Sequence, residues 1–432
     1  MVARDKAMTD TKTDTGTYAS KVQTLRTPAG LEVWLVEDYA VPLVALDFAF
    51  AGGASQDPAD KEGVATLLSA LLDEGAGPYD AAAFHEALDD KAVEISFSAE
   101  RDRFQGRLKT LTRNLEPAFE LLRLAVNEPH LAEDALERMR AQVLAGLRRD
   151  SKDPDALAGR AFRQAAYPNH PYGRATRGSL EGVAKIVRDD VVAMRQKLFT
   201  RAGLKIAAVG AIDAATLGKL VDSVFAGLPA ENALAPVPAI EMQSLGERKI
   251  IDLDVPQSTI RFGLPGIARK DPDHMTGIVV NHILGGGVFS ARLFKEVREK
   301  RGLAYSVHSQ LATLDHTAMF SGGTSTKNER AAESLSVIEE EIAKMAADGP
   351  TAEELDKAKK YLTGSYALRF DSSTKIAGQL VHLQTEGFPV DYLDRRNAEI
   401  ETVTLDDAKR VAKRLFDGKK LLVAVAGKPT GM

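Results

Sequence analysis

Hydrophobic and polar residues are arranged in blocks along the chain, and the blocks predict pairs of strands separated by helices. Leu31 to Val36 and Val41 to Ala51 have the composition of two strands, the second with alternating apolar positions. Val93 to Ala99 and Arg103 to Leu111 predict a second pair. Leu204 to Val209 is apolar except for Lys205 and is followed by a glycine, which is typical of a buried strand.

Amphipathic segments with a period near 3.6 residues separate these strands and predict helices. The predicted helices are Gly63 to Leu72, Ala81 to Asp89, Leu115 to Val126, Ala132 to Arg149, Pro154 to Ala166 and Asp189 to Phe199. Such blocks of strands and helices indicate an α+β fold in which an antiparallel-rich sheet is packed by helices on one face. Because 432 residues are too many for one core, we expect more than one domain.

The second half of the chain repeats the pattern of the first. Residues 186–210 align without a gap with residues 403–427, at an offset of about half the chain. The pair Asp57-Pro58, with Gly63 after it, recurs as Asp271-Pro272 with Gly277 at nearly the same offset. Two matches in the same order predict a duplication, and therefore two homologous domains.

The predicted organisation has four parts. Residues 1–21 form a polar lead without an apolar segment, which we expect to be disordered. An N-terminal domain spans residues 22–227 and a C-terminal domain spans residues 247–432. The proline-bearing residues 228–246 between them predict an extended linker, which is also a candidate hinge.

Composition excludes several classes of function. The 61 acidic and 56 basic residues are interspersed, which argues against binding to nucleic acid or to a charged membrane surface. The chain has no cysteine, so thiol catalysis, disulfides and cysteine zinc sites are excluded. None of the eight histidines stands three or four positions from another. His382 and Glu386 lie one helical turn apart, but no third ligand is evident, and a solvated helix face explains them better.

The segment GGGVFSARLFKEVREKRGLAY contains the strongest candidate for chemistry. Three glycines are followed by a predicted helix whose apolar face includes Phe289 and Phe294, a stop at Gly302 and a predicted strand. Arg298 falls in the last helical turn and Tyr305 near the strand start, so both side chains could meet at one point.

An arginine and a tyrosine that meet in this way can hold a carbonyl oxygen and stabilise an oxyanion. The alternative is structural: Arg298 caps the C-terminus of the helix, and Tyr305 is half-buried in a sheet. The spacing alone does not decide between these two interpretations.

From about Val22 onward, the chain resembles one subunit of the insulinase/pitrilysin family of zinc metallopeptidases, in its short processing-peptidase-like form. The segments that carry the resemblance are DPADKEGVATLLSALLDEGAG at residues 57–77, YPNHPYGRATRGSLEGV at residues 167–183 and REKRGLAYSV at residues 298–307. The resemblance implies two homologous domains that form half of a clam-shell chamber. It also implies that Arg298 and Tyr305 complete an active site from the C-terminal half.

The chain departs from this family where active members bind zinc. Their H-x-x-E-H motif places two histidine ligands and a glutamate base on one helix. Here the aligned motif positions include Thr66, Ser69 and Ala70, and the third ligand, a glutamate, aligns near Gly146. Of these residues only Thr66 could contact a metal, and then weakly. The sequence therefore predicts no zinc site in this chain.

The resemblance implies a heterodimer with a homologous subunit that carries H-x-x-E-H and the zinc. This chain would be the zinc-free subunit, inactive alone, and the substrates would be peptides. Gly285, Gly286 and Gly287 resemble the glycine-rich loop of the zinc-free subunit of mitochondrial processing peptidase, although a flexible helix cap is the alternative. A non-catalytic structural subunit and a homodimeric peptide-binding protein are the competing hypotheses.

Localisation rests on the same resemblance. Bacterial relatives of this form are commonly exported, while the N-terminal segment has no apolar region typical of a signal peptide. We expect the periplasm if the polar lead has replaced a signal peptide, with the cytoplasm as the alternative.

Overall fold

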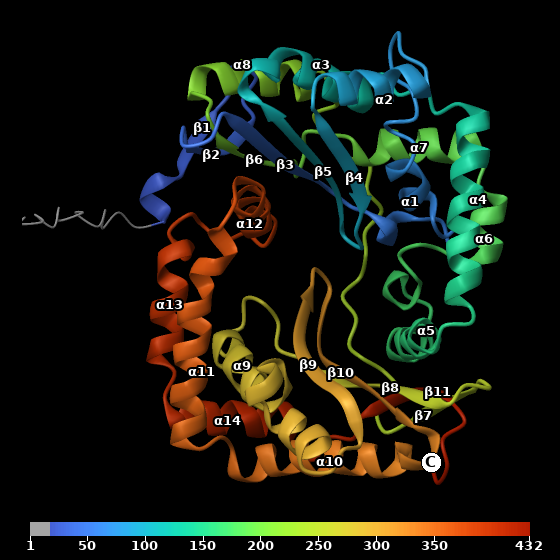
Figure 1. The fold of residues 1–432 in the computed structure, drawn as a ribbon, viewed down its shortest axis with the longest axis vertical. Helices are drawn as coiled ribbons and strands as arrows, with labels where there is room; N and C mark the ends of the chain where they lie inside the picture. Colours follow the sequence, from blue (N-terminus) through green and yellow to red (C-terminus); the bar gives the residue numbers. More distant parts are fainter. Residues whose placement is uncertain (1–17) are drawn as a thin grey trace, which may run out of the picture.

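The computed structural model describes residues 18–432, which form a mixed α+β fold with two sheets (Figure 1). The first sheet has the order β1-β2-β6-β3-β5-β4 and the second has the order β7-β11-β8-β10-β9. The first consists of β1 (Gln23–Arg26), β2 (Glu32–Glu37), β3 (Leu43–Ala51), β4 (Glu94–Ala99), β5 (Arg103–Leu111) and β6 (Lys205–Gly210). The second consists of β7 (Arg248–Asp252), β8 (Gln257–Pro265), β9 (Ala304–Leu314), β10 (Thr317–Lys327) and β11 (Leu422–Gly427). Both sheets are antiparallel except for one parallel pair in each, β2 with β6 and β7 with β11.

Helices cover the outer face of each sheet (Figure 1). The first sheet is covered by α2 (Ala81–Asp90), α3 (Leu115–Asn127) and α8 (Ala214–Phe225). The second is covered by α10 (Ala331–Asp348) and α14 (Leu405–Phe416). The strand and helix boundaries predicted in the first half agree with the structure to within about two residues, except for Gly63 to Leu72. In that segment α1 is shorter, Val64–Ser69, because the chain turns after Ala70.

Two helices cross from one half of the chain to the inner face of the other half's sheet. In Figure 1, α12 (Ser373–Thr385) lies against the first sheet and α5 (Pro154–Ala166) lies against the second. Ala45 and Ala49 face α12 from β3, and their small side chains allow the helix to approach the sheet closely. Under α5, a Cβ atom on Gly263 would lie 2.7 Å from the Phe162 ring. The two halves are therefore interlocked rather than merely linked.

The remaining helices form the two sides of the molecule (Figure 1). One side has α1, α4 (Glu133–Asp150), α6 (Leu180–Lys185) and α7 (Arg188–Leu198), and the other has α9 (His274–Asn281), α11 (Ala352–Gly364) and α13 (Tyr392–Thr402). Short 3-10 turns are η1 (Ala19–Lys21), η2 (Ala54–Gln56), η3 (Thr112–Asn114), η4 (Pro171–Gly173), η6 (Val288–Ser290), η8 (Asn328–Arg330) and η9 (Ser365–Phe370). Two segments, η5 (His282–Gly286) and η7 (Phe294–Glu299), are π-helical.

The aligned segments of the predicted duplication have the same structure in both halves. Each forms a helix followed by a strand, α7 with β6 and α14 with β11. Asp190 accepts a hydrogen bond from the N-cap amide of α7, and Asp407 does the same at α14. The glycine that ends each strand has nearly the same positive φ, 142° at Gly210 and 147° at Gly427. An angle of this kind strongly favours glycine, which explains why both halves have one there.

The first described residues are ordered against the C-terminal half. The amides of Tyr18 and Ala19 donate to the Asp394 carboxylate at 3.0 and 3.2 Å. The Tyr18 ring stacks on Phe370 with centroids 4.8 Å apart. Disorder was predicted for residues 1–21, and this is wrong for residues 18–21, because α13 and η9 supply partners for them. Residues 1–17 lie outside the described part of the chain.

Residues 228–246, the predicted linker, contain no helix or strand, but they are fixed along their length. Gln56 and Ala235 exchange two hydrogen bonds, at 3.0 and 2.8 Å. The Pro238 carbonyl lies 3.0 Å from the buried His170 ring, and the Ile240 amide donates to the His316 carbonyl. These contacts join the linker to both halves, which argues against the hinge hypothesis. His170 has the structural role expected of its turn.

Candidate functional site

Arg298 and Tyr305 lie together at the point where the chain reverses from η7 into β9. The reversal is fixed by the Gly302 amide, which donates to the Arg298 carbonyl at 3.0 Å, and by a positive φ of 58° at Gly302. The Arg298 guanidinium carbon lies 4.7 Å from the centroid of the Tyr305 ring and 4.8 Å from that of Phe294. Two aromatic rings therefore hold the guanidinium by cation–π contacts.

This packing leaves the hydrogen-bonding groups of both side chains available. Within residues 18–432, neither the Arg298 guanidinium nor the Tyr305 hydroxyl has a hydrogen-bonding or ionic partner. Tyr305 is 82% exposed, so the alternative in which it is half-buried in the sheet is wrong. Arg298 does not cap its helix either; the carbonyl of Glu296 is bonded by Arg301 instead. Both candidates thus present free donors on one surface.

The segment before Arg298 differs from the predicted regular helix. The glycine run is followed by the 3-10 turn η6, and π-helical turns precede and follow it. Phe289 was predicted on the apolar face but is 68% exposed, because η6 turns it away from the core. Its ring contacts the edge of Phe294, with centroids 5.1 Å apart. Phe289, Phe294, Arg298 and Tyr305 therefore form a continuous row of contacts.

The three glycines pack closely instead of forming a free loop. A Cβ atom on Gly285 would lie 2.8 Å from the Ser309 nitrogen of β9, and one on Gly287 would lie 2.8 Å from the His282 carbonyl oxygen. Asn281, next to η5, also binds β9, because its side-chain oxygen accepts a 2.8 Å hydrogen bond from the Ser309 hydroxyl. The glycines allow η5 to lie directly against β9, which supports the strand that carries Tyr305.

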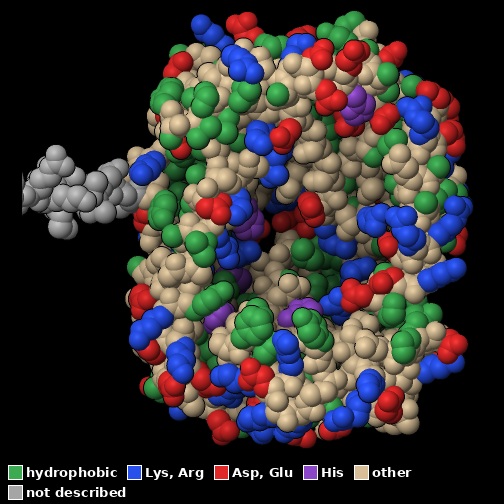
Figure 2. Space-filling view, in the orientation of Figure 1, with side chains coloured by type: hydrophobic (Ala, Val, Ile, Leu, Met, Phe, Trp, Pro, Cys, Tyr) green, Lys and Arg blue, Asp and Glu red, His purple; other side chains and the backbone are tan. Residues whose placement is uncertain are grey.

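Figure 2 shows one face of the molecule with a central hollow, and hydrophobic side chains and histidines gather below the hollow, over α9 and β9. Val288 and Tyr361 are 53% and 60% exposed, and Tyr361 stacks on His282 beside the glycine run. Burial lowers the pKa of His282, so this imidazole is neutral at pH 7.

The positions that hold zinc in the resembling family are filled by other contacts. The Thr66 hydroxyl donates to the Thr176 carbonyl at 3.0 Å, and the Ser69 hydroxyl donates to the Thr66 carbonyl at 2.8 Å. A Cβ atom on Gly146 would lie 2.6 Å from Nη2 of Arg177. The Arg177 guanidinium thus lies at the place expected for the third ligand, and it pairs with Asp150 at 3.1 Å.

These residues do not fit a metal ion. Across the described residues, no group of three or more histidine, aspartate or glutamate side chains could hold one. At Thr66, Ser69, Ala70 and Gly146, where the sequence lacks the ligands of the resembling family, the structure has two bonded hydroxyls, a methyl group and a glycine; the absence of zinc stays a prediction. Arg177 could not be found from the sequence, because nothing in a loop arginine indicates that its side chain lies beside Gly146, where the resembling family has its third zinc ligand.

A buried aspartate fixes the helix that carries these positions. Asp57 accepts hydrogen bonds from the Gly63 and Ala65 amides at 2.7 and 2.9 Å, and so holds the start of α1. Burial raises the pKa of Asp57 to about 7, although the two amides act in the opposite direction. The equivalent Asp271 lies nearer the surface and pairs with Arg414 at 2.6 Å.

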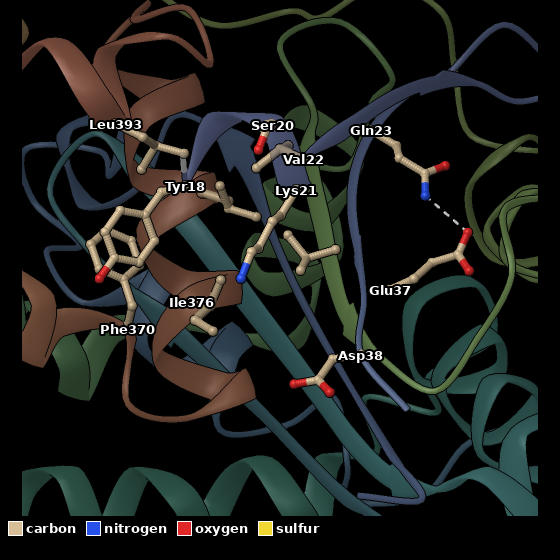
Figure 3. Close-up of a pocket in the computed structure, with 12 residues that line it drawn as sticks. Tyr18, Ser20, Lys21, Val22, Gln23, Glu37, Asp38, Phe370, Ile376 and Leu393 are labelled. Carbon is tan, nitrogen blue, oxygen red and sulfur yellow. Dashed lines mark hydrogen bonds between the residues drawn. The ribbon is translucent and has the colours of Figure 1, made fainter. Parts of the chain in front are cut away.

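Figure 3 shows a second depression, of about 640 Å³, between the N-terminal segment and the C-terminal helices. Tyr18 and Phe370 stack at one end, and Gln23 donates to Glu37 at the other. None of the site residues predicted from the sequence lines this pocket. None of the described helices combines the length and the apolar character needed to cross a membrane.

The two halves match the two models of one protein family. Residues 33–179 match the model for the insulinase family (peptidase family M16), and residues 185–362 match the model for the peptidase M16 inactive domain. A crystal structure of a peptidase M16 inactive domain from Pseudomonas fluorescens superposes with a TM-score of 0.88 at 30% identity, covering 95% of this chain and 98% of that one.

Curated relatives agree with this match. A Helicobacter pylori protein named non-peptidase homolog YmxG is 28% identical over 392 residues, covering 90% of each chain. An uncharacterized zinc protease of Mycobacterium leprae is 26% identical over 410 residues, covering 93% of this chain and 90% of the relative. The fold and the two family models together define a peptidase-like, two-domain protein. The chain belongs to the insulinase family, peptidase family M16, and its residues 185–362 match that family's inactive domain.

Proposed function

We propose that this chain is the zinc-free subunit of a heterodimeric zinc metallopeptidase. The observation that carries the proposal is the contrast between its two halves. Arg298 and Tyr305 are stacked and present free donors, whereas the zinc positions of α1 and α4 hold hydroxyls, an alanine, a glycine and the Arg177 guanidinium. A chain with one part of an active site and not the other is expected to need a partner with the missing part.

The partner would be a homologous subunit with H-x-x-E-H, which supplies the zinc, the attacking water and the glutamate base. The two subunits would enclose a peptide chamber, with the hollowed face of Figure 2 directed inward. In this arrangement the chain alone does not hydrolyse peptides.

Arg298 and Tyr305 have distinct roles in the proposed site. The planar Arg298 guanidinium holds a backbone carbonyl of the substrate, since its N–H edges stay open while its faces are stacked. The Tyr305 hydroxyl donates to the oxyanion that develops when water attacks the peptide carbonyl. Gly285, Gly286 and Gly287 support β9 and the exposed Val288 and Phe289, which are placed to contact the substrate near Tyr305.

Peptide binding without hydrolysis is the second candidate. The H. pylori relative is named a non-peptidase homolog, which favours a role of this kind. In that case Arg298 and Tyr305 would hold the ends or carbonyls of a captured peptide, and no zinc-bearing partner would be needed. Measuring hydrolysis with and without a zinc-bearing homologue separates the two candidates, because only the first predicts activity that depends on the mixture.

A further inference from the structure

A small pocket with both polar and apolar lining residues lies between α5 and the inner face of the second sheet. It has a volume of about 330 Å³ and is lined on one side by Asp155 and Arg163 of α5. The other side consists of Arg261 from β8, His308 and Gln310 from β9, and Ser321 from β10. The pocket is therefore built from both halves of the chain, at the place where α5 crosses to the second sheet.

Arg163 is the unusual residue of this pocket. Its Nε is buried, and within residues 18–432 no acceptor forms a hydrogen bond or ion pair with its guanidinium. The Nε–H is thus one of the five guanidinium donors that is buried without an acceptor, and a buried unpaired donor is costly. Two other arginines near the pocket do have partners. Arg101 donates to the Pro171 and Arg174 carbonyls, and Arg261 pairs with Asp155.

Like charges surround Arg163. Burial, together with the nearby Arg101, Arg160 and Arg261, lowers its pKa to about 10, while Asp155 acts in the opposite direction. Arg163 still carries its charge at pH 7. His308 also lies close to these positive charges. Burial lowers the pKa of its imidazole, and the charge of Arg261 lowers it as well. The pocket thus holds more positive than negative charge, and its one carboxylate is already bonded to Arg261.

We propose that this pocket binds a carboxylate group of a peptide, with Arg163 as the principal ligand. The planar fork of a guanidinium matches the two oxygens of a carboxylate, and a pair of this kind would satisfy the donors that are free. The ion pair between Asp155 and Arg261 shows that a carboxylate fits beside the arginines of this pocket. Gln310 and Ser321 supply further polar groups at the rim.

The position of the pocket gives it a place in the proposed peptidase site, and this step rests on the proposed function. Edge strand β9 carries both Tyr305 and His308, and three residues of a strand span about 10 Å. The ladder between β9 and β10 is irregular between Ala304 and Val307, so strict side-chain alternation does not hold there. A peptide running along β9 would reach the pocket about three positions from the bond held by Arg298 and Tyr305.

Binding to the isolated full chain tests the carboxylate site. The probes are three fluorescent peptides of one sequence: the first has a central glutamate and blocked ends, the second has glutamine there, and the third has glutamine with a free C-terminal carboxylate. We expect the glutamate peptide or the free-carboxylate peptide to bind on the order of tenfold or more tightly than the blocked glutamine peptide. The peptide that shows the preference identifies whether a side chain or a chain end supplies the carboxylate.

Variants of Arg163 test whether the pocket causes the tighter binding of the carboxylate peptide. Arg163→Gln should abolish this preference, and Arg163→Lys should retain part of it. Arg160→Gln removes a cation one turn away that does not line the pocket, so most of the preference should remain. Asp155→Asn frees Arg261 and should strengthen binding of the preferred peptide. Equal binding of all three peptides, absence of binding, or a preference that survives Arg163→Gln would each overturn the proposal.

The outcome is independent of the proposed function, because the assay uses this chain alone and leaves Arg298 and Tyr305 unchanged. A failed carboxylate site leaves the split peptidase site standing. Conversely, carboxylate-dependent binding can be found even if no mixture hydrolyses peptides.

Discussion

The Arg298 guanidinium carbon lies 4.7 Å from the centroid of the Tyr305 ring, across the chain reversal at Gly302. The contact fixes the plane of the guanidinium and leaves its edge free, which is the arrangement needed to bind a carbonyl oxygen. Seven positions separate the two residues in the sequence, and the π-helical end of η7 brings them together. The proposed role of the pair can be tested by removing either donor.

Arg298→Ala and Tyr305→Phe should each lower peptide hydrolysis by the mixture with a zinc-bearing homologue on the order of 10²-fold. Tyr305→Phe retains the ring that stacks on Arg298 and removes only the hydroxyl. Steady-state kinetics measure the loss, and size-exclusion chromatography should show unchanged assembly.

Arg301→Ala is the matched control for this pair of variants. Arg301 is a nearby surface cation that pairs with Glu296 and lies outside the proposed site. Its replacement should leave kcat unchanged. If Arg298→Ala and Tyr305→Phe are as active as this control, the two residues do not take part in hydrolysis.

This chain should bind zinc only when the four ligand positions are replaced and Arg177 is also removed. Thr66→His, Ser69→Glu and Ala70→His rebuild the motif, and Gly146→Glu supplies the third ligand. A side chain on Gly146 meets Nη2 of Arg177 at 2.6 Å, and the guanidinium also repels a cation. Metal analysis after dialysis should find about one zinc per chain when Arg177→Ala is added and little without it. Equal zinc content in both variants would show that Arg177 does not block the site.

Tyr172 should contribute strongly to the connection between the halves. Its hydroxyl donates to Asp102 at 2.7 Å and accepts from the His316 amide at 3.2 Å, beside the ion pair of Arg103 with Asp315. Tyr172→Phe leaves buried polar groups unpaired and should lower the free energy of unfolding by about 1–3 kcal/mol.

Urea denaturation measures the change. Tyr39→Phe is the control, since it removes an exposed hydroxyl that bonds to Glu37. Its effect should stay below about 0.5 kcal/mol. If the two variants are destabilised equally, Tyr172 has no special role between the halves.

Asp271 should make stability depend on acid pH. The hydrogen bond from Arg414 lowers the pKa of Asp271 to about 2, below the value of about 3.9 in an unfolded chain. The stabilisation is therefore present above about pH 4 and is lost as the pH falls through 2. Asp271→Asn should be less stable than the wild type at pH 7 by about 1 kcal/mol or less, since the pair is near the surface.

This difference should shrink when urea midpoints are measured at pH 2.5. Asp60→Asn changes an exposed carboxylate and should show no such trend. A gap between Asp271→Asn and the wild type that stays constant from pH 7 to pH 2.5 would contradict the assignment of the shift to Arg414.

Strands and helices with a clear period were predictable, because local alternation and burial coincide in them. The segment predicted as Val41 to Ala51 contains β3, Leu43–Ala51, and Pro154 to Ala166 forms α5. The exchange of α5 and α12 between the sheets was not predictable, since it depends on contacts between residues far apart in the chain. Phe289 was placed wrongly because a 3-10 turn interrupts the helical period.

The candidate site was predictable in part. The glycine stop and the flanking helix and strand indicated that Arg298 and Tyr305 could meet. The stacking of Arg298 on Phe294 and Tyr305, and the absence of hydrogen-bonding partners for Arg298 and Tyr305 within the described residues, depend on atomic positions. Arg163 gave no signal, because an arginine on an amphipathic helix usually lies in solvent. Its isolation arises only when α5 packs on the second sheet.

The proposed active site is divided between two subunits. Its test measures zinc content and hydrolysis of a fluorogenic peptide for this protein alone, for an H-x-x-E-H homologue alone and for their mixture. A divided site predicts that this chain is zinc-free and inactive, and that activity in the mixture exceeds that of the homologue alone and is lost with Arg298→Ala. If this chain binds zinc and hydrolyses the peptide by itself, the site is not divided.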